Sequence, residues 1–367
     1  MKVAIVHDWL VSNGGAENCL EVFCELFPGA DVYTLIYNPA AIRSEKIKRM
    51  KIRTSFIQNL PCGRKFYRHY LPLMPYAVES FNLEGYDFIL SSSHCVAKGA
   101  RAQKGARHLC YCYTPMRYVW EMYGAYFDKR QTRLLASLAM PFFANHLRKW
   151  DVASSKRVHK FVAISETVRA RIKEHYETDA DVLFPPVDTG FFGNTGEKRE
   201  DFFLVVSRFV PYKRIGLAVA AFNRLGLPLV VIGGGPGEKE LRKMAGKNTR
   251  ILTEQSGESI RSHYSRCRAL VFCGLEDFGI VPLEAQACGA PVIAFGQGGL
   301  KETVVEGKTG VFFAEQTETA LAETVKKFSL MKFSEKDAVD NALKYSRDKF
   351  KAGFKEYAEN FIKMKGE

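Results

Sequence analysis

Two glutamates in one short segment have the spacing of a ligand-binding pair. Glu276 and Glu284 stand eight positions apart in EDFGIVPLEAQACGAPV. The preceding apolar run ends at Gly274, so Glu276 falls in the loop that follows a strand. Pro282 suits the first turn of a helix, because its missing N–H is unpaired there in any residue. We expect Glu284 to project from that first turn and Gly289 to end the helix.

The start of this helix is also suited to an anion. The amides of Gly279, Ile280 and Val281, with Phe278 beside them, lie at the expected N-terminus, where free N–H groups and the helix dipole favour negative charge. Two carboxylates there would repel a bare phosphate unless they bind hydroxyls instead. A ligand with phosphates in the middle and a sugar at each end meets both conditions. For Glu284 alone, the alternative of an acid that only complements the dipole stays open.

A basic pair lies after another predicted strand, in SRFVPYKRIG (207–216). Arg208 and Lys213 are close enough along the loop to converge on one diphosphate, the arginine binding two oxygens and the lysine acting as a point charge. The alternative is that Lys213 and Arg214 are solvated charges at the start of a helix. Cations at that end oppose the helix dipole, which favours the binding interpretation.

A glycine-rich loop, IGGGPGEKE (232–240), has part of the dinucleotide-binding pattern. Counted from Gly233, the third glycine of that pattern falls at position 238, which is Glu238, so a hydride-transfer enzyme is a poor second choice.

Apolar runs predict the elements that position these residues. Runs of β-branched and aromatic residues, separated by amphipathic stretches, are typical of parallel sheets in doubly wound α/β domains. In the first half the runs are VAIVHDW (3–9), DVYTLIY (31–37), FILSSS (88–93), HLCYCYT (108–114), FVAIS (161–165) and DVLFP (181–185). In the second half they are FFLVVS (202–207), PLVVIG (228–233), TRILTE (249–254), ALVFCG (269–274), PVIAFG (291–296) and TGVFFA (309–314).

The stretch PPVDTGFFGNTGEKRED (185–201) separates the two series, and its prolines and glycines indicate an interdomain linker. A length of 367 residues also suits two domains. We therefore expect an N-terminal domain over 1–188 and a C-terminal one over 189–346. Ligands bind at the carboxyl ends of such strands, so two facing sheets would enclose a central cleft.

Composition limits the class of protein. A hydrophobic content of 47% and a charged content of 25% are those of a folded, soluble chain. The opening MKVAIVHDW has no basic segment followed by a cleavage site, so we expect a cytoplasmic protein. The nine cysteines are scattered through apolar runs without zinc-ligand spacing, and the D-x-D of TDADV (178–182) precedes a predicted strand. We therefore predict reduced thiols, no metal and no cofactor.

The chain resembles the family-4 retaining glycosyltransferases of GT-B fold, also called glycosyl transferases group 1. The resemblance rests on HDWLVSNGGAE, SSSHCVAKG, YCYTPMRYVW, RKWDVASSKRVHKFVAIS, FPPVDTGFF, SRFVPYKRIGLAV and EDFGIVPLE, and it covers nearly the whole chain. It is strongest toward bacterial enzymes that transfer mannose from GDP-mannose during surface-polysaccharide synthesis, lipopolysaccharide among them. Two Rossmann-like domains, with a last helix (347–367) returning to the first, are the fold that it implies.

The resemblance also implies roles. Glu284 would bind the donor ribose, Glu276 the hydroxyls of the transferred sugar, and Arg208 and Lys213 the diphosphate, where positive charge stabilises the departing nucleoside diphosphate. A further set of donor contacts comes from glycines in two loops, namely Gly14, Gly15, Gly234 and Gly235. The acceptor would be lipid-linked or a polysaccharide, and the transfer would retain the anomeric configuration.

One departure concerns the acceptor side. The family pattern leads us to expect histidine in a YCHTP-like segment, where this chain has Tyr113 in YCYTP. Tyrosine is a poor base at neutral pH. His94, at the end of FILSSS, is then the better candidate for positioning the acceptor, although a lone histidine is more often structural. Asp8 and Glu276 are possible nucleophiles, and neither is compelling.

The net charge of +13 implies an anionic partner. Residues 43–68 carry nine Lys or Arg against one acid, and KRQTRLLASLAMPFFANHLRK (129–149) has basic ends around an apolar centre. Such segments suit an anionic membrane surface. A solvated basic face is the alternative for either segment alone. We favour peripheral contact with the cytoplasmic face of the inner membrane.

Three other functions stay open. A UDP-sugar-dependent glycosyltransferase would show the same motifs, and so would a nucleotide-sugar enzyme of GT-B fold that uses no acceptor. A nucleic-acid-binding protein would explain the charge, but the chain has no zinc-finger spacing or RNP-like motif, and we expect no nucleic acid.

Overall fold

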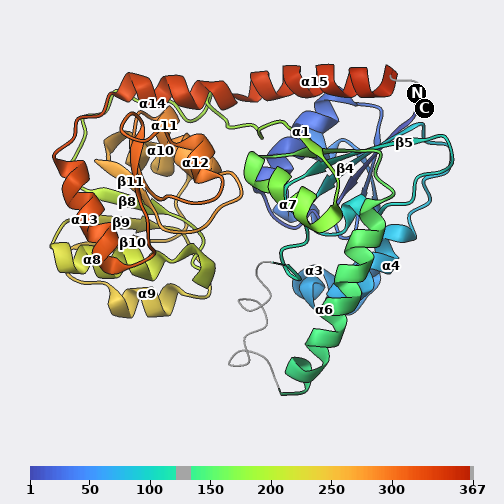
Figure 1. Ribbon diagram of the computed structural model, residues 1–367, viewed down its shortest axis with the longest axis horizontal. Helices are drawn as coiled ribbons and strands as arrows, with labels where there is room; N and C mark the ends of the chain where they lie inside the picture. Colours follow the sequence, from blue (N-terminus) through green and yellow to red (C-terminus); the bar gives the residue numbers. More distant parts are fainter. Residues whose placement is uncertain (121–133, 364–367) are drawn as a thin grey trace. The chain divides into compact units, whose positions relative to one another are not determined.

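The computed structural model describes residues 1–120 and 134–363. Contacts divide the chain into two compact units (Figure 1). Unit 1 comprises Met1–Pro185 and Phe350–Glu367, and unit 2 comprises Pro186–Lys349. The sequence placed the division between 188 and 189 and began the returning helix at 347.

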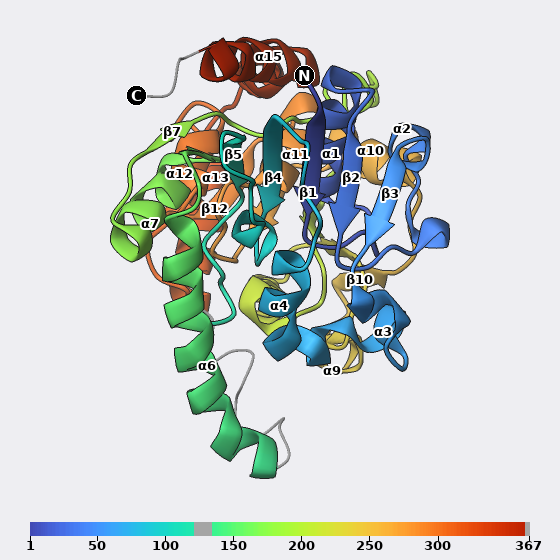
Figure 2. The same ribbon diagram turned by 90° about the vertical axis from the view of Figure 1, so that its right-hand side faces the viewer.

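Unit 1 is built on a seven-stranded parallel sheet, seen in Figure 2. Its order is β3-β2-β1-β4-β5-β6-β7, which reverses direction after β1 as in doubly wound folds. The strands are β1 (Val3–His7), β2 (Asp31–Thr34), β3 (Lys51–Thr54), β4 (Phe88–Ser93), β5 (Arg107–Cys112), β6 (Lys160–Ala163) and β7 (Ala180–Val182). Strand β3 lies inside the basic stretch and was not predicted, because three of its four residues are exposed.

Helices of unit 1 cover the sheet and extend from its carboxyl edge. They are α1 (Gly15–Leu26), α2 (Glu45–Lys48), α3 (Gly63–Phe66), α4 (Met74–Glu79), α6 (Leu134–Ser155), α7 (Glu166–Tyr176) and α15 (Arg347–Lys363), with 3₁₀ turns η1 (Pro39–Ala41), η2 (Phe56–Asn59), η3 (Tyr67–Leu73) and η4 (Ala97–Gly99). On α15, Phe354 is fully buried and its ring lies 4.4 Å from that of Phe23 on α1. This packing holds the end of the chain on unit 1.

Unit 2 has the same architecture, built on a six-stranded parallel sheet in the order β10-β9-β8-β11-β12-β13. The strands are β8 (Phe203–Val206), β9 (Leu229–Ile232), β10 (Thr249–Leu252), β11 (Ala269–Phe272), β12 (Val292–Phe295) and β13 (Gly310–Phe313). The helices are α8 (Ile215–Leu225), α9 (Glu238–Met244), α10 (Gly257–Arg266), α11 (Ile280–Ala287), α12 (Leu300–Thr303), α13 (Glu318–Ser329) and α14 (Glu335–Ala342), with 3₁₀ turns η5 (Pro211–Lys213) and η6 (Leu343–Tyr345). Buried apolar clusters on both faces of this sheet join it to its helices.

The stretch predicted as an interdomain linker is packed on unit 2 from Pro186 onward. Phe192 packs edge to face on Tyr264, with ring centroids 5.8 Å apart. The Arg199 guanidinium donates to the carbonyl of Cys267 at 2.8 Å and pairs with Glu335. Its prolines and glycines therefore mark a packed irregular segment, and the linker prediction was wrong for most of its length.

Two smaller expectations also differ from the structure. Asp181 lies inside β7, where it pairs with Lys160 at 3.0 Å and accepts a hydrogen bond from Tyr357 at 2.7 Å. It does not precede the strand as predicted. The basic residues 129–133 of the second amphipathic segment lie outside the described residues, whereas its later part belongs to α6.

Candidate functional site

Lys213 and Glu276 meet at the carboxyl edge of the sheet in unit 2. Lys213 ends η5, after β8, and Glu276 follows β11, the neighbouring strand. The lysine ammonium donates to Glu276 Oε1, and each side chain is 18% exposed. A Cβ at Gly274 would lie 3.2 Å from the Lys213 Cα, so glycine there allows the two loops to approach closely. The pair places one cation and one carboxylate within reach of a ligand.

The Glu276 backbone is held by a second loop. Its carbonyl accepts the Gly299 N–H at 2.9 Å, and it forms an isolated bridge with Gly298. A Cβ on Gly298 would lie 2.4 Å from the Glu276 carbonyl oxygen, and Gly298 has a positive φ of +66°. Glycine is therefore required where these loops cross, and this contact fixes the position from which the carboxylate projects.

Arg208, the other predicted phosphate ligand, is exposed. Within residues 1–120 and 134–363 its guanidinium makes no ion pair, so the charge is available to a ligand. The structure brings Lys213 together with Glu276, while convergence of Arg208 and Lys213 on one diphosphate stays a prediction.

The glycine-rich loop packs against the loop that carries Arg208. Phe209 N donates to the carbonyl of Gly234 at 2.9 Å. A Cβ on Gly233 would lie 1.8 Å from the Ser207 carbonyl oxygen, and one on Gly235 would lie 2.8 Å from that of Phe209. Loop packing thus accounts for these two glycines. A Cβ on Gly234 would meet open space, and a donor contact at Gly234 and Gly235 stays a prediction.

Glu284 lies on α11, at the start of the second turn and not in the first turn as predicted. The helix begins at Ile280, two residues before Pro282, and its first turn contains no acid. Glu284 is the fifth helical residue and is partly exposed. Proline is tolerated at several positions of a first turn, so the expected register was off.

Two neighbours that the sequence did not reveal act on Glu284. The Tyr264 hydroxyl, on α10, donates to Glu284 Oε2 at 3.2 Å. Burial raises the pKa of Glu284 to about 7, the nearby Asp188 adds to the rise, and the Tyr264 hydrogen bond opposes it. A carboxylate with this pKa changes charge near neutral pH and accepts ligand hydroxyls when ionised.

Gly279 shapes the start of α11. It is the N-cap residue, with a φ of +106°, and a Cβ there would lie 2.5 Å from Cδ2 of Leu300. Ile280 and Val281 are the first two helical residues, so their amides have no partner within the helix. Phe278 is buried at 3% exposure and its ring packs on Tyr345. The Phe278 side chain is thus part of the core, and only its backbone is placed to meet a ligand.

In unit 1, Asp8 organises the carboxyl end of β4. This fully buried carboxylate accepts the backbone N–H groups of residues 94–97 at 2.6–3.0 Å. Four hydrogen bonds use both oxygens of the carboxylate. Asp8 therefore fixes the turn that carries His94, and its interpretation as a nucleophile loses support.

His94 follows β4 and is partly exposed. Its Nδ1 lies 3.1 Å from Asp8 Oδ2, and its ring packs edge-on to Trp9 with centroids 4.5 Å apart. Burial lowers the pKa of His94 more than the Asp8 charge raises it. The imidazole is therefore neutral at pH 7 and is able to accept a proton or a hydrogen bond.

Tyr113 has a structural position. Its hydroxyl bonds with Ser92 Oγ at 2.8 Å and donates to the Ala16 carbonyl at 3.1 Å, which ties β5 to the start of α1. Burial raises the pKa of Tyr113 well above its usual value. Tyr113 is 8% exposed, and its hydroxyl is already hydrogen-bonded to Ser92 and Ala16. The hydroxyl is therefore not free to transfer a proton.

The loop with Gly14 and Gly15 starts α1, with Gly14 as the exposed N-cap residue. Glu17, in the first turn, is 8% exposed, and burial raises its pKa to about 7. A Cβ on Gly14 would lie 3.2 Å from Glu17 Oε2, so the carboxyl sits directly beneath the loop. The sequence analysis did not single out this buried acid.

Residues 1–120 and 134–363 contain no group of three or more His, Cys, Asp or Glu side chains placed to hold a metal ion. No helix among the described residues has the length and hydropathy needed to cross a bilayer.

Taken with the fold, these contacts define a two-domain α/β protein with a cation, two carboxylates and a helix N-terminus at the carboxyl edge of its second sheet. Residues 188–345 match the sequence model of the family described as glycosyl transferases group 1. The match covers this part of the chain alone, and the chain as a whole has the GT-B fold.

Relatives with curated names match part of the chain. An uncharacterized glycosyltransferase of Methanocaldococcus jannaschii is 28% identical over 171 residues, covering 45% of this chain and 48% of that protein. A GDP-mannose-dependent alpha-(1-6)-phosphatidylinositol monomannoside mannosyltransferase of Mycolicibacterium smegmatis is 34% identical over 123 residues, covering 29% and 32% respectively. The chain thus spans about half, or less, of the length of these relatives.

A solved structure matches along nearly the whole chain. HepE of Anabaena in complex with UDP-glucose covers 98% of this chain and 100% of its own, with a TM-score of 0.65 and 16% identity. At that identity the likeness concerns the fold.

Proposed function

We propose that this protein transfers a hexose, with mannose favoured, from a nucleoside-diphosphate sugar to a lipid-linked or polysaccharide acceptor. The observation that carries the proposal is the pairing of Lys213 with Glu276, which lies four residues before the start of α11. Both residues lie in the part of the chain that matches the model of glycosyl transferases group 1. A carboxylate, a cation and a second carboxylate are suited to bind a sugar, a diphosphate and a ribose, in that order.

A bound donor would replace the contact between Lys213 and Glu276. Its diphosphate attracts the Lys213 ammonium and the exposed Arg208 guanidinium. Once Lys213 binds the diphosphate, Glu276 is free to accept hydrogen bonds from hydroxyls of the transferred sugar. The amides at the start of α11 add partial positive charge. Glu284, held by Tyr264, accepts the ribose hydroxyls. Positive charge that is already in place also stabilises the nucleoside diphosphate as it leaves.

GDP-mannose is favoured as donor because the mycobacterial relative is named for GDP-mannose and mannose transfer. HepE, which shares the fold, is described with UDP-glucose. A UDP-sugar is therefore the second candidate, and the pocket for the base must decide between them.

Retention of configuration is proposed from the family resemblance. The acceptor hydroxyl oxygen bonds to the anomeric carbon as the bond from that carbon to the donor phosphate breaks. The acceptor proton passes to an oxygen of the departing diphosphate. We assign the orientation of the acceptor hydroxyl to neutral His94 in unit 1; its partial exposure and its contacts with Asp8 and Trp9 support this role.

Membrane contact is proposed for a surface of unit 1 that we call the basic aromatic patch. It consists of the exposed side chains Arg64, Lys65, Phe66, Arg68, Leu73 and Tyr76. Figure 2 shows α3 and α4, which bear most of them, at the end of the sheet toward which β1 and β3 point. Cations beside exposed aromatic rings suit the boundary of an anionic bilayer. The cytoplasmic face of a membrane, where a lipid-linked acceptor resides, is the proposed location.

Titration with nucleotides tests the proposal. GDP, UDP and ADP are added in turn and thermal unfolding is followed. A ligand at 100 times its Kd stabilises the folded protein by about 2.7 kcal/mol, so a shift with GDP that exceeds the shifts with UDP and ADP is expected. Stabilisation by UDP alone would indicate a UDP-sugar as the donor in place of GDP-mannose. If none of the three nucleotides shifted the unfolding temperature, the proposal would be overturned.

A further inference from the structure

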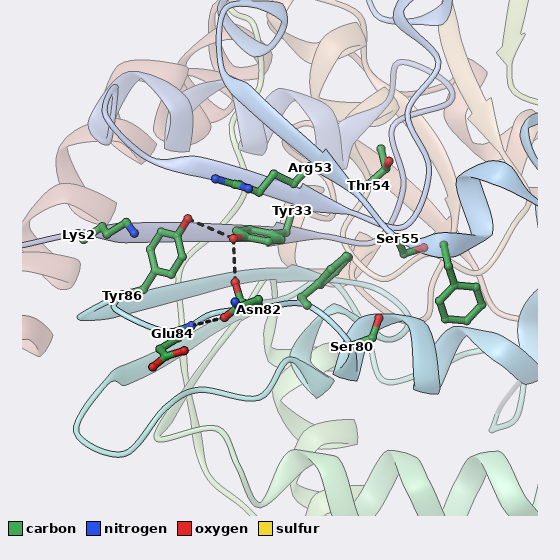
Figure 3. Close-up of a pocket in the computed structure, with 11 residues that line it drawn as sticks. Lys2, Tyr33, Arg53, Thr54, Ser55, Ser80, Asn82, Glu84 and Tyr86 are labelled. Carbon is green, nitrogen blue, oxygen red and sulfur yellow. Dashed lines mark hydrogen bonds between the residues drawn. The ribbon is translucent and has the colours of Figure 1, made fainter.

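A separate pocket of about 400 Å³ lies on unit 1, against one face of β2 and β3 (Figure 3). Four aromatic rings form part of its wall, those of Tyr33, Phe56, Phe81 and Tyr86. Polar and charged groups complete the lining, including Lys2, Arg53, Thr54 and Glu84. None of these residues takes part in the site described above.

The inner wall of the pocket is held by hydrogen bonds. The Tyr33 hydroxyl donates to the Asn82 carbonyl at 2.9 Å and lies 3.1 Å from the Tyr86 hydroxyl. Behind them, Asp31 accepts from Tyr86 and pairs with Arg53 at 3.2 Å. Tyr33 and Tyr86 are 5% and 2% exposed. The aromatic floor is therefore preorganised, and a ligand would not need to order it.

Groups at the mouth of the pocket are available to a ligand. Figure 3 shows Lys2 beside Tyr86 and Arg53 beside Tyr33. The Lys2 ammonium lies 4.2 Å from the centroid of the Tyr86 ring. Within residues 1–120 and 134–363, neither Lys2 Nζ nor the Glu84 carboxylate makes an ion pair. Two cations thus accompany one free carboxylate, together with the Thr54 hydroxyl.

The chemistry of this lining fits a saccharide that carries a negative charge. The ring of Phe56, which is 44% exposed, gives apolar contact area that a sugar ring covers, and a few convergent polar groups give orientation. Glu84 and Thr54 are placed to bond hydroxyls. The Lys2 ammonium is placed to bind a carboxylate or phosphate on the sugar, and the Arg53 guanidinium, although paired with Asp31, adds positive charge to the same lining.

The pocket lies in the same unit as His94, the residue proposed to position the acceptor. It extends from Lys2, at the amino end of β1, to Ser55 and Phe56, directly after β3. The sheet order β3-β2-β1-β4 puts three strand spacings, about 14 Å, between the carboxyl ends of β3 and β4. His94 follows β4. A glycan whose reacting end lies at His94 would reach the pocket with a unit farther along its chain.

We propose that this pocket binds an acidic sugar unit of the acceptor glycan, away from the sugar that receives the transferred hexose. The inference rests on the proposed transferase function and adds the chemical class of the acceptor. It makes the pocket a specificity site for a charged glycan.

Binding of two probes tests the proposal by isothermal titration. Trigalacturonate supplies carboxylates on a saccharide, and maltotriose is a neutral saccharide of equal length. We expect trigalacturonate to bind at least 10-fold more tightly than maltotriose. The substitutions Lys2→Gln and Phe56→Ala should each weaken trigalacturonate binding at least 3-fold without lowering the thermal stability. Lys104→Gln, an exposed lysine outside the pocket in the same unit, should leave it unchanged.

Three results would overturn the proposal: no trigalacturonate binding, equal binding of both probes, or an equal loss in Lys2→Gln and Lys104→Gln, which would indicate general charge attraction. Titration with GDP of the unsubstituted and Lys2→Gln proteins separates the two levels. In the unsubstituted protein, GDP stabilisation beside absent trigalacturonate binding would reject the acceptor site alone, whereas absent GDP binding would reject the transferase function itself. In Lys2→Gln, GDP stabilisation should be unchanged.

Discussion

Lys213 and Glu276 form an ion pair across two loops that follow neighbouring strands, β8 and β11. The pair satisfies both charges in the folded chain and leaves each side chain 18% exposed. In the proposed complex a diphosphate would compete for the lysine, and a sugar hydroxyl would compete for the carboxylate. The ion pair would then account for a carboxylate in a site proposed to bind phosphates.

Replacing Lys213 by alanine should lower transfer about 100-fold, because the leaving diphosphate loses a charge-assisted contact in the transition state. The free energy of unfolding should fall by about 1 kcal/mol, since water still reaches Glu276. Product formation and thermal unfolding measure the two effects. Lys332→Ala, at an exposed lysine of the same unit, is the matched control. Full transfer activity in folded Lys213→Ala would show that the donor site lies elsewhere.

Replacing Glu284 by glutamine should have opposite effects on stability and donor binding. Burial raises the pKa of Glu284 from 4.5 to about 7, so between those values the folded protein binds more protons than the unfolded chain. Stability is therefore lost as the pH rises through this window. Glutamine has no charge to bury, and Glu284→Gln should raise the free energy of unfolding at pH 8 by roughly 1–3 kcal/mol while changing it little at pH 4.

The same substitution should weaken GDP binding about 10-fold, because an ionised acceptor of ribose hydroxyls is lost. In the unsubstituted protein, GDP binding should strengthen as the pH rises through 7. Denaturant unfolding and GDP titration at pH 5, 7 and 8 measure both effects. Glu323→Gln, at an exposed glutamate on α13, should change neither. GDP binding that is unchanged in Glu284→Gln would remove Glu284 from the ribose site.

The apolar runs predicted the strands because buried parallel strands are continuous in hydrophobicity. FILSSS coincides with β4 (Phe88–Ser93), and each other predicted run overlaps a strand. The exception, β3 (Lys51–Thr54), is an edge strand with polar, exposed residues, so no apolar run marks it. This strand contributes to the proposed acceptor pocket of unit 1, because Arg53 and Thr54 of β3 line it.

The site was less accessible to sequence reasoning than the sheets. The spacing of Glu276 and Glu284 indicated a ligand site, but it could not reveal that Lys213 pairs with Glu276, since that contact depends on how two loops meet. Tyr264 lies on another helix, and no local pattern links it to Glu284. Tyr113 was singled out by a family pattern, whereas its hydroxyl is occupied by Ser92 and Ala16.

His94 and Tyr113 are distinguished by paired substitutions. His94→Gln should lower the turnover number with saturating donor at least 10-fold and leave stability nearly unchanged, because its ring is partly exposed. Tyr113→Phe should lower the free energy of unfolding by about 1–2 kcal/mol, since Ser92 and the Ala16 carbonyl lose a partner, with turnover within about 3-fold of the unsubstituted protein. Rates and denaturant unfolding measure both. A loss of turnover confined to Tyr113→Phe would reverse the assignment.

Charge reversal on the basic aromatic patch tests the membrane contact. Arg64 and Lys65 are exposed beside Phe66, which is itself 46% exposed, so their cations can approach anionic headgroups while the ring enters the boundary.

Because each near-surface cation contributes about 1 kcal/mol, the double substitution Arg64→Glu/Lys65→Glu should weaken sedimentation with phosphatidylglycerol vesicles roughly 30-fold or more. Binding to phosphatidylcholine vesicles should be weak for every variant. The double substitution Lys326→Glu/Lys327→Glu, on exposed positions of α13, changes the net charge equally and should retain binding. If both double variants lose binding to the same extent, net charge drives the association and the patch has no special part in it.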